Sequence, residues 1–129
     1  MSGQVEILFS TIANVRPYLQ GARLKVFAVT SARRSSLAPE LPTVQEAGIP
    51  GYDIDVWFGL FGPAGLPRAI VEKLNREINA VLAQPEVRQT LETALFEPAS
   101  QSPDAFAALL RRDVERFARM IRSANIKAE

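Results

Sequence analysis

The segment 24–30, LKVFAVT, constrains the fold of this chain more than any other part of the sequence. In an extended conformation Val26 and Ala28 fall on one side and Phe27 on the other, so both faces of the segment are mostly apolar. A strand that is apolar on both faces is typical of a parallel sheet with helices packed on both sides. We therefore expect an α/β fold in which residues 24–30 form a buried strand.

The rest of the chain alternates short β-prone runs with helical patterns. We predict further extended or strand segments at 4–9, 52–62 and 96–98. We predict helices at 10–20, 43–48, 67–84, 85–94 and 103–124. The first helix contains Pro17 and is expected to end at Gly21. With 129 residues, the chain has the length of one domain with short connections between its elements.

Start signals mark three of these helices. Thr43 and Glu46 have the spacing of a capping box, in which the hydroxyl meets an amide three residues on and the carboxylate reaches back. Pro67 fits the first position of the next helix. Ser102 is a suitable N-cap, followed by Pro103 at the first helical position. On the last helix, Arg111 and Arg119 lie four residues on either side of Glu115 and are expected to pair with it on a solvated face.

The chain contains no cysteine and no histidine. This excludes disulfides, cysteine-ligated metals and thiolate nucleophiles, and it removes the usual general base near neutral pH. Asp53 and Asp55 alone do not make a metal site. We therefore expect no cofactor, no metal and no catalysis. The enzymatic alternative, a small hydrolase or isomerase, would have to depend on carboxylates.

The charges nearly cancel, because 15 Lys and Arg face 14 Asp and Glu for a net charge of +1. Neither half of the chain is strongly basic, so nucleic acid is not expected as a partner. No run approaches the ~18 apolar residues of a membrane-spanning helix. The first residues lack the basic and apolar regions of a secretory signal, so we expect no signal peptide in this chain.

Three consecutive motifs, at 21–34, 41–52 and 57–65, resemble the C-terminal part of the Bug family, the periplasmic solute-binding receptors of tripartite tricarboxylate transporters. Residues 3–9 and 124–127 resemble the same family, so the resemblance covers almost the whole chain. Members of that family are considerably longer than this chain. We therefore expect a truncated form that contains only part of the family's fold.

The resemblance implies a partial type II periplasmic-binding-protein-like fold, in which two α/β lobes enclose a ligand cleft. Residues 1–50 would be the remnant of the distal ligand-binding lobe. Residues 51–129 would be the hinge strand and the C-terminal helices of the proximal lobe, the whole forming one compact unit. The resemblance also implies a periplasmic location, a small carboxylate ligand and the membrane subunits of a transporter as partners.

Two positions depart from the family's usual pattern. Leu66 stands where the family often has Thr before the Pro that opens the long helix, and Leu cannot accept an amide hydrogen bond. The expected cost of the lost cap is about 1 kcal/mol. Ser10 stands where the family often has an acid after its first matching strand.

The resemblance implies that the carboxylate is held by neutral donors, and three groups of residues are candidates. Ser10, Thr11 and Asn14 lie where the first strand leads into a helix, whose N-terminus favours an anion. The same three residues could simply cap that helix. These two interpretations remain open.

The other candidates are Thr30, Ser31 and Trp57. Thr30 and Ser31 end the second strand, where two hydroxyls could reach the cleft or start a turn. Trp57 could form an aromatic wall for the ligand, although packing in the core is the more common role of a large aromatic side chain.

A lobe without its complete sheet leaves strand edges and apolar faces unpaired, and such surfaces favour pairing between copies. We therefore also expect a homo-oligomer. The alternative function is an oligomeric interaction module that has lost ligand binding.

Overall fold

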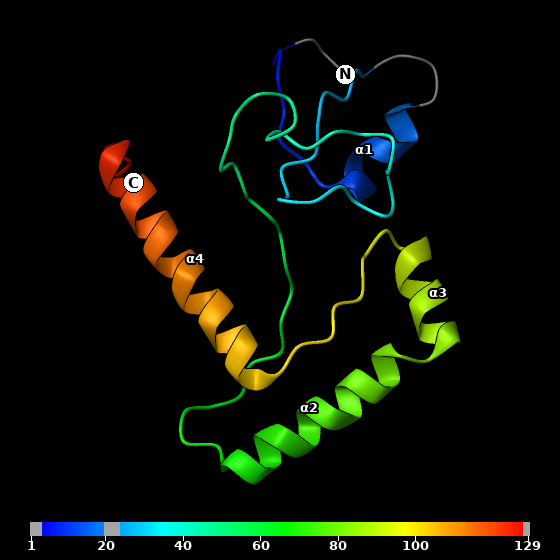
Figure 1. The fold of residues 1–129 in the computed structure, drawn as a ribbon, viewed down its shortest axis with the longest axis vertical. Helices are drawn as coiled ribbons and strands as arrows, with labels where there is room; N and C mark the ends of the chain where they lie inside the picture. Colours follow the sequence, from blue (N-terminus) through cyan, green and yellow to red (C-terminus); the bar gives the residue numbers. More distant parts are fainter. Residues whose placement is uncertain (1–3, 20–23, 128–129) are drawn as a thin grey trace. The chain divides into compact units, whose positions relative to one another are not determined.

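The computed structural model describes residues 4–19 and 24–127. These ranges contain four helices, α1 (Ile12–Leu19), α2 (Arg68–Leu82), α3 (Pro85–Thr93) and α4 (Pro103–Ser123), joined by long non-helical segments (Figure 1). The chain divides into two compact units. The first lies within Met1–Phe61 and Gln89–Pro98, and the second within Gly62–Arg88 and Ala99–Glu129.

In the first unit, the predicted strands do not assemble into a sheet. The described residues contain one isolated parallel bridge, between Val29 and Thr43, and no longer ladder. The Val29 N–H donates to the Pro42 carbonyl at 2.8 Å, and the Val44 N–H donates to the Val29 carbonyl at 3.0 Å. The predictions of strands at 4–9, 24–30, 52–62 and 96–98 are therefore wrong, because none of these segments forms a regular strand. A strand is stable only beside neighbouring strands, and the described part of this unit supplies a single bridge.

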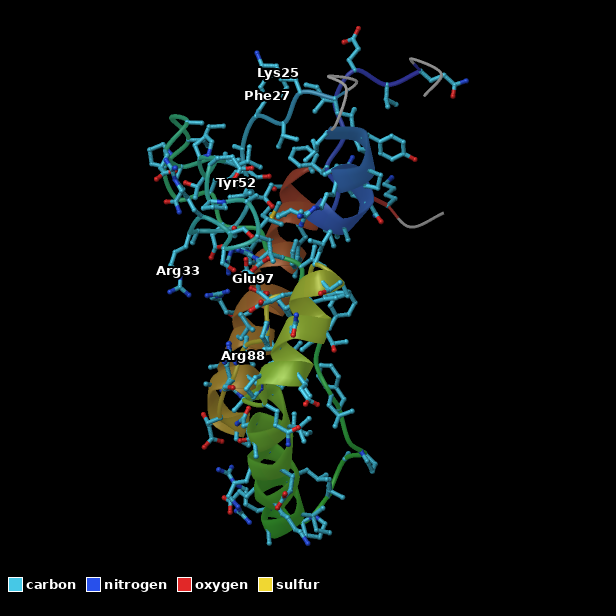
Figure 2. All side chains as sticks on the ribbon, turned by 90° about the vertical axis from the view of Figure 1, so that its right-hand side faces the viewer. Lys25, Phe27, Arg33, Tyr52, Arg88 and Glu97 are labelled. Atoms are coloured by element: carbon cyan, nitrogen blue, oxygen red, sulfur yellow. The ribbon has the colours of Figure 1, made fainter. Side chains whose placement is uncertain are left out.

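The segment 24–30, predicted as a buried strand, is instead half-buried, with Lys25 and Phe27 exposed. Phe27 is 67% exposed, and its ring is covered on one face by Lys25, whose Nζ lies 5.3 Å from the ring centroid (Figure 2). Among the described residues Ala38 alone forms a buried hydrophobic position, at 6% exposure.

The capping box is formed as the sequence predicts. The Thr43 N–H donates to Glu46 Oε2 at 2.8 Å, and the Glu46 N–H donates to Thr43 Oγ1 at 3.1 Å. The short helix predicted at 43–48 is wrong, because the segment forms successive turns that end at Gly48. Gly48 has a φ of 111°, which a right-handed helix cannot contain.

The first helix, α1, begins at Ile12, two residues after the predicted start, and the predicted end at Gln20 lies outside the described residues. The Thr11 carbonyl accepts the N–H groups of Asn14 and Val15 at 3.1 and 3.3 Å, which starts the helix, and Pro17 lies within it. The predicted stop at Gly21 lies outside the described residues.

In the second unit, α2 contacts α4 through polar groups. Arg68 donates to both carboxylate oxygens of Asp104 at 2.9 Å. The Gln101 carbonyl accepts from the side-chain amides of Asn75 at 2.8 Å and Asn79 at 3.2 Å. These contacts fix the start of α4 against α2.

The helix starts follow the predictions with one correction. Ser102 is the N-cap of α4 and its hydroxyl accepts the Ala105 N–H at 3.2 Å. Pro67 is the N-cap of α2 rather than its first helical residue, because its ψ of 135° is not helical. No side chain caps α2. Leu66 lies close to Gly62. A side chain at position 62 would place its Cβ only 3.0 Å from the Leu66 Cδ2.

The ion pairs on α4 differ from those predicted. In the described part of the helix, Glu115 forms no ion pair with Arg111 or Arg119; instead Asp113, only 4% exposed, pairs with Arg112 and Arg116, each at 3.2 Å. A buried carboxylate has more to gain from a neighbouring guanidinium than an exposed one, which explains the different partners.

The apolar stripes of both long helices are present and only partly covered, with Val71, Ile78 and Leu82 of α2 half-buried. On α2, Ile70, Leu74 and Val81 are 45–47% exposed, and on α4, Val114 is 60% exposed. No helix within the described ranges is long and apolar enough to cross a membrane.

Candidate functional site

The predicted site residues all belong to the first unit. Two of them, Thr30 and Ser31, come directly after Val29, which forms the isolated bridge. The Thr30 carbonyl accepts the Ile54 N–H at 2.9 Å. The next amide, that of Ala32, donates to Asp53 Oδ1 at 3.1 Å. Thr30 and Ser31 are therefore held, half-buried, against the segment 53–54.

The hydroxyl of Ser31 is engaged within its own turn. Its Oγ donates to the Arg33 carbonyl at 2.8 Å. This is the hydrogen bond of a serine that starts a turn. To donate to a ligand, the Ser31 hydroxyl must first rotate away from that carbonyl.

The candidate residues at α1 stand apart from this set of hydrogen bonds. Ser10, Thr11 and Asn14 are exposed at the start of the helix, and the hydrogen bonds that hold Thr30 and Ser31 do not include them. Their hydroxyl and amide groups are open to solvent, and the free N–H groups of the first turn lie beside them.

Trp57 lies in an aromatic group on the segment 52–61. Its ring centroid is 6.5 Å from that of Phe61, with the planes tilted by 42°. Next to it in sequence, Phe58 meets Phe96 edge-on, with centroids 5.4 Å apart. Trp57 itself is half-buried, whereas Phe58 is 76% exposed.

Sequence reasoning missed the acids that organise the loop at 31–43. Three carboxylates accept main-chain N–H groups of this loop: Asp53 from Ala32, Glu97 from Leu37, and Glu46 from Thr43. The Glu46 partner could be found from its local spacing. Asp53 and Glu97 are distant in sequence from their partners, so no local pattern points to them.

The pKa values of two of these acids reflect the hydrogen bonds. The Thr43 N–H and the Arg34 guanidinium lower the pKa of Glu46. For Glu97, partial burial raises the pKa, but hydrogen bonds from the hydroxyls of Ser35 and Ser36 and from nearby N–H groups outweigh it and leave the pKa lowered. Both carboxylates are therefore ionised at neutral pH.

The chemistry that this arrangement offers is the binding of anions by uncharged donors. The loop presents hydroxyl and main-chain N–H groups, which bind carboxylates without a buried cation. Among the described residues, no group of three or more acidic side chains is placed to hold a metal ion.

The family of the chain follows from a match that extends over almost its whole length. The family described as the tripartite tricarboxylate transporter family receptor matches residues 1–126. The chain belongs to this family. The resemblance read from the three sequence motifs is thereby confirmed.

Curated relatives of this receptor family include proteins from several bacteria. A protein in the tcbD-tcbE intergenic region of Pseudomonas sp. (strain P51) is 34% identical over 122 residues, which is 94% of this chain and 36% of the relative. Protein BugT of Bordetella pertussis is 26% identical over 127 residues, covering 98% of this chain and 39% of BugT. The chain thus spans a little over a third of the length of these receptors.

One relative is much closer in length. A protein in the clcB-clcD intergenic region of Pseudomonas knackmussii is 25% identical over 122 residues, and the match covers 94% of this chain and 72% of that protein.

The solved structure of the periplasmic binding protein BugD shares the fold. It matches with a TM-score of 0.69 and 27% identity, covering 89% of this chain and 39% of BugD. The chain therefore has part of the α/β periplasmic-binding-protein fold of a two-lobed receptor. This explains the open strand segments, since the covered part of BugD is a minority of its fold.

Proposed function

We propose that this chain is the C-terminal portion of a solute receptor that binds a small carboxylate in the periplasm and delivers it to the membrane subunits of a transporter. The observation that carries the proposal is the family match over residues 1–126. The proposal of a carboxylate ligand is supported by the loop after Val29, where the uncharged Ala32 N–H donates to the Asp53 carboxylate.

In this proposal the ligand is held by neutral groups. Thr30 and Ser31 supply hydroxyls, and Ser10, Thr11 and Asn14 supply polar side chains beside the free N–H groups of α1. Trp57 forms an apolar wall. The role is binding without chemical conversion, consistent with a sequence without histidine or cysteine.

The division into lobes is also a proposal. We assign residues 1–50 to the distal lobe and residues 51–129 to the hinge strand and proximal lobe. The two compact units of the structure describe how this chain packs, whereas the lobes refer to the complete receptor.

A thermal-shift panel of dicarboxylates and tricarboxylates tests the function. A ligand at 100 times its Kd stabilises the folded protein by about 2.7 kcal/mol. We expect at least one carboxylate to raise the Tm, and Ser31→Ala to reduce that rise. Ser123→Ala is the matched control, because its hydroxyl bonds to the Met120 carbonyl on α4. A flat panel, or an equal rise in the Ser31→Ala variant, would contradict the proposal.

Self-association is the second candidate property, and one observation favours it. Large apolar side chains on the segments 5–9 and 56–61 are 60% exposed or more, apart from Trp57. Burial of such surface is favourable at roughly 25 cal/mol per Å². We therefore propose that copies of this chain associate through these segments.

A further inference from the structure

The loop at 35–37 holds a carboxylate of its own chain in a way that the solute site does not use. Glu97 Oε1 accepts the Ser35 hydroxyl at 2.5 Å and the Leu37 N–H at 3.4 Å. The hydroxyl and N–H of the adjacent Ser36 also act on this carboxylate and contribute to lowering its pKa. All of these donors are uncharged.

The neighbouring arginines do not take part in this contact. Arg34 is engaged by Glu46, with Nε 2.9 Å from Oε2, and by the Pro39 carbonyl. Arg33 extends outward from the loop, away from Glu97 (Figure 2). Within 4–19 and 24–127, the loop therefore binds the carboxylate as a group of hydroxyl and amide dipoles, without an ion pair.

The loop is organised independently of Glu97. The Ser35 hydroxyl also accepts the Leu37 N–H at 3.1 Å, and the Ser35 carbonyl accepts the Ala38 N–H at 3.2 Å. A second turn follows, in which the Ala38 carbonyl accepts the Leu41 N–H at 3.1 Å. Ala38 at the centre is buried. The donors are thus positioned by turns around a buried residue, as expected of a preformed anion site.

We propose that Ser35–Leu37 is a carboxylate-binding loop whose ligand is the Glu97 side chain, and that this contact is a latch on the segment that follows α3. Two stretches make up the first unit, and the latch joins them. Glu97 lies one residue before Pro98, where the chain leaves that unit. The Phe58–Phe96 ring contact lies beside it in sequence and joins the same two stretches.

The latch makes a specific chemical prediction that is independent of the receptor's solute. With the Glu97 side chain removed, the donors are left open, and a free monocarboxylate such as acetate can take its place. If Glu97 had only a structural role and the loop were no anion site, the Glu97-deficient chain would have no place for acetate to bind.

The experiment follows the backbone amide signals of Ser36 and Leu37 by NMR in the full chain, during titration with sodium acetate. In Glu97→Ala we expect both signals to shift from their wild-type positions and to return toward them, saturably, as acetate is added. The wild type and the matched control Glu92→Ala, an exposed acid on α3, should not respond. Acetamide and sodium chloride should have no effect on any of the three.

An absence of saturable acetate response in a folded Glu97→Ala chain would overturn the proposal, as would an equal response in the wild type. If Glu97→Ala does not fold, the milder variants Ser35→Ala and Glu97→Gln are combined in a double-mutant cycle of unfolding. The latch requires that the two substitutions are not additive. Additive effects would contradict it.

Discussion

Thr43 is one of two buried polar side chains among the described residues, at 3% exposure. Its hydroxyl accepts the Glu46 N–H, while its own N–H donates to the Glu46 carboxylate. Because Thr43 is also the partner of Val29 in the isolated bridge, the capping box holds that bridge in place.

We therefore expect Thr43→Ala to lower the free energy of unfolding by about 1 kcal/mol, the usual effect of losing such a cap. Thr43→Ser keeps the hydroxyl and should lose less. The measurement is urea unfolding followed by circular dichroism. Equal losses in the two variants would show that the hydroxyl is not the stabilising group.

The lowered pKa values of Glu46 and Glu97 make the first unit sensitive to acid. A carboxyl whose pKa is lower in the folded chain than in the unfolded chain stabilises the fold above the unfolded value. That stabilisation is lost as the pH falls through the folded pKa. We expect stability to fall as the pH drops below the ordinary glutamate pKa of 4.5.

Acid titration followed by circular dichroism checks this expectation. In a variant carrying both Glu46→Gln and Glu97→Gln, stability at pH 7 should be lower and the loss on acidification smaller. A double variant with an unchanged acid transition would contradict the assignment of the transition to these two groups.

For single residues, a contact could be predicted from the sequence only where its two partners lie close together along the chain. The Thr43–Glu46 pair is three residues apart, so its spacing alone predicts both hydrogen bonds. The contact of Ser35 with Glu97 joins residues far apart in sequence. Thr30 and Ser31 are candidates because the sequence predicts a strand that ends at them, but no local pattern predicts the Asp53 carboxylate, which accepts the nearby Ala32 N–H.

The helices are the elements whose bounds follow most closely from local chemistry. Ser102 caps α4, and Pro103 and Asp104 follow as sequence reasoning expects. The same logic places Pro67 at the start of α2, one position away from its observed role. End signals of this kind act within one turn, so the surrounding fold has little influence on them.

Ser102→Ala should destabilise α4 by about 1 kcal/mol, because the Ala105 N–H then loses its acceptor. Ser102→Asp keeps an acceptor and adds a charge that suits a helix N-terminus, so it should be neutral or stabilising. Thermal unfolding followed at the helical signal near 222 nm distinguishes the variants. Loss of stability in Ser102→Asp equal to that in Ser102→Ala would contradict the cap.

Strands are the elements for which prediction failed, and the reason is physical. The β-prone patterns at 4–9 and 24–30 describe side chains suited to a sheet, but a sheet needs neighbouring strands to accept its hydrogen bonds. This chain covers 39% of BugD, so such neighbours need not lie within it. The patterns predict the environment of the complete receptor better than that of this chain.

For the molecule as a whole, the unusual property is the amount of exposed apolar surface. Phe9, Phe58 and Leu60 are each more than 65% exposed, and the apolar stripes of α2 and α4 are partly exposed as well. Isolated exposed apolar residues are common, but runs of them mark surfaces that are covered in the functional state.

Light scattering across a range of protein concentrations tests this property. We expect the weight-average mass to rise with concentration above that of a 14.2 kDa monomer. A variant with Phe9→Ser and Phe58→Ser should associate less, whereas Phe117→Ser on α4 serves as a comparison with a less exposed side chain. A constant monomer mass in the unmodified chain would contradict the proposed association.

The family and the order of the four helices could be predicted from the sequence, because both depend on local motifs that persist in part of a fold. The arrangement of the candidate site could not. Thr30 and Ser31 are tied to the segment 53–54, whereas Ser10, Thr11 and Asn14 take no part in that network. Residues from distant segments form one site only when a complete fold brings them together.

The central claim is that uncharged donors of this chain bind a carboxylate, and an NMR titration with succinate tests it most directly, with the neutral analogue succinamide as the control. We expect saturable shifts of the amide signals at 30–32 and 10–14 with succinate and none with succinamide. Shifts confined to the arginine-rich helix α4, or equal shifts with the two compounds, would contradict the claim.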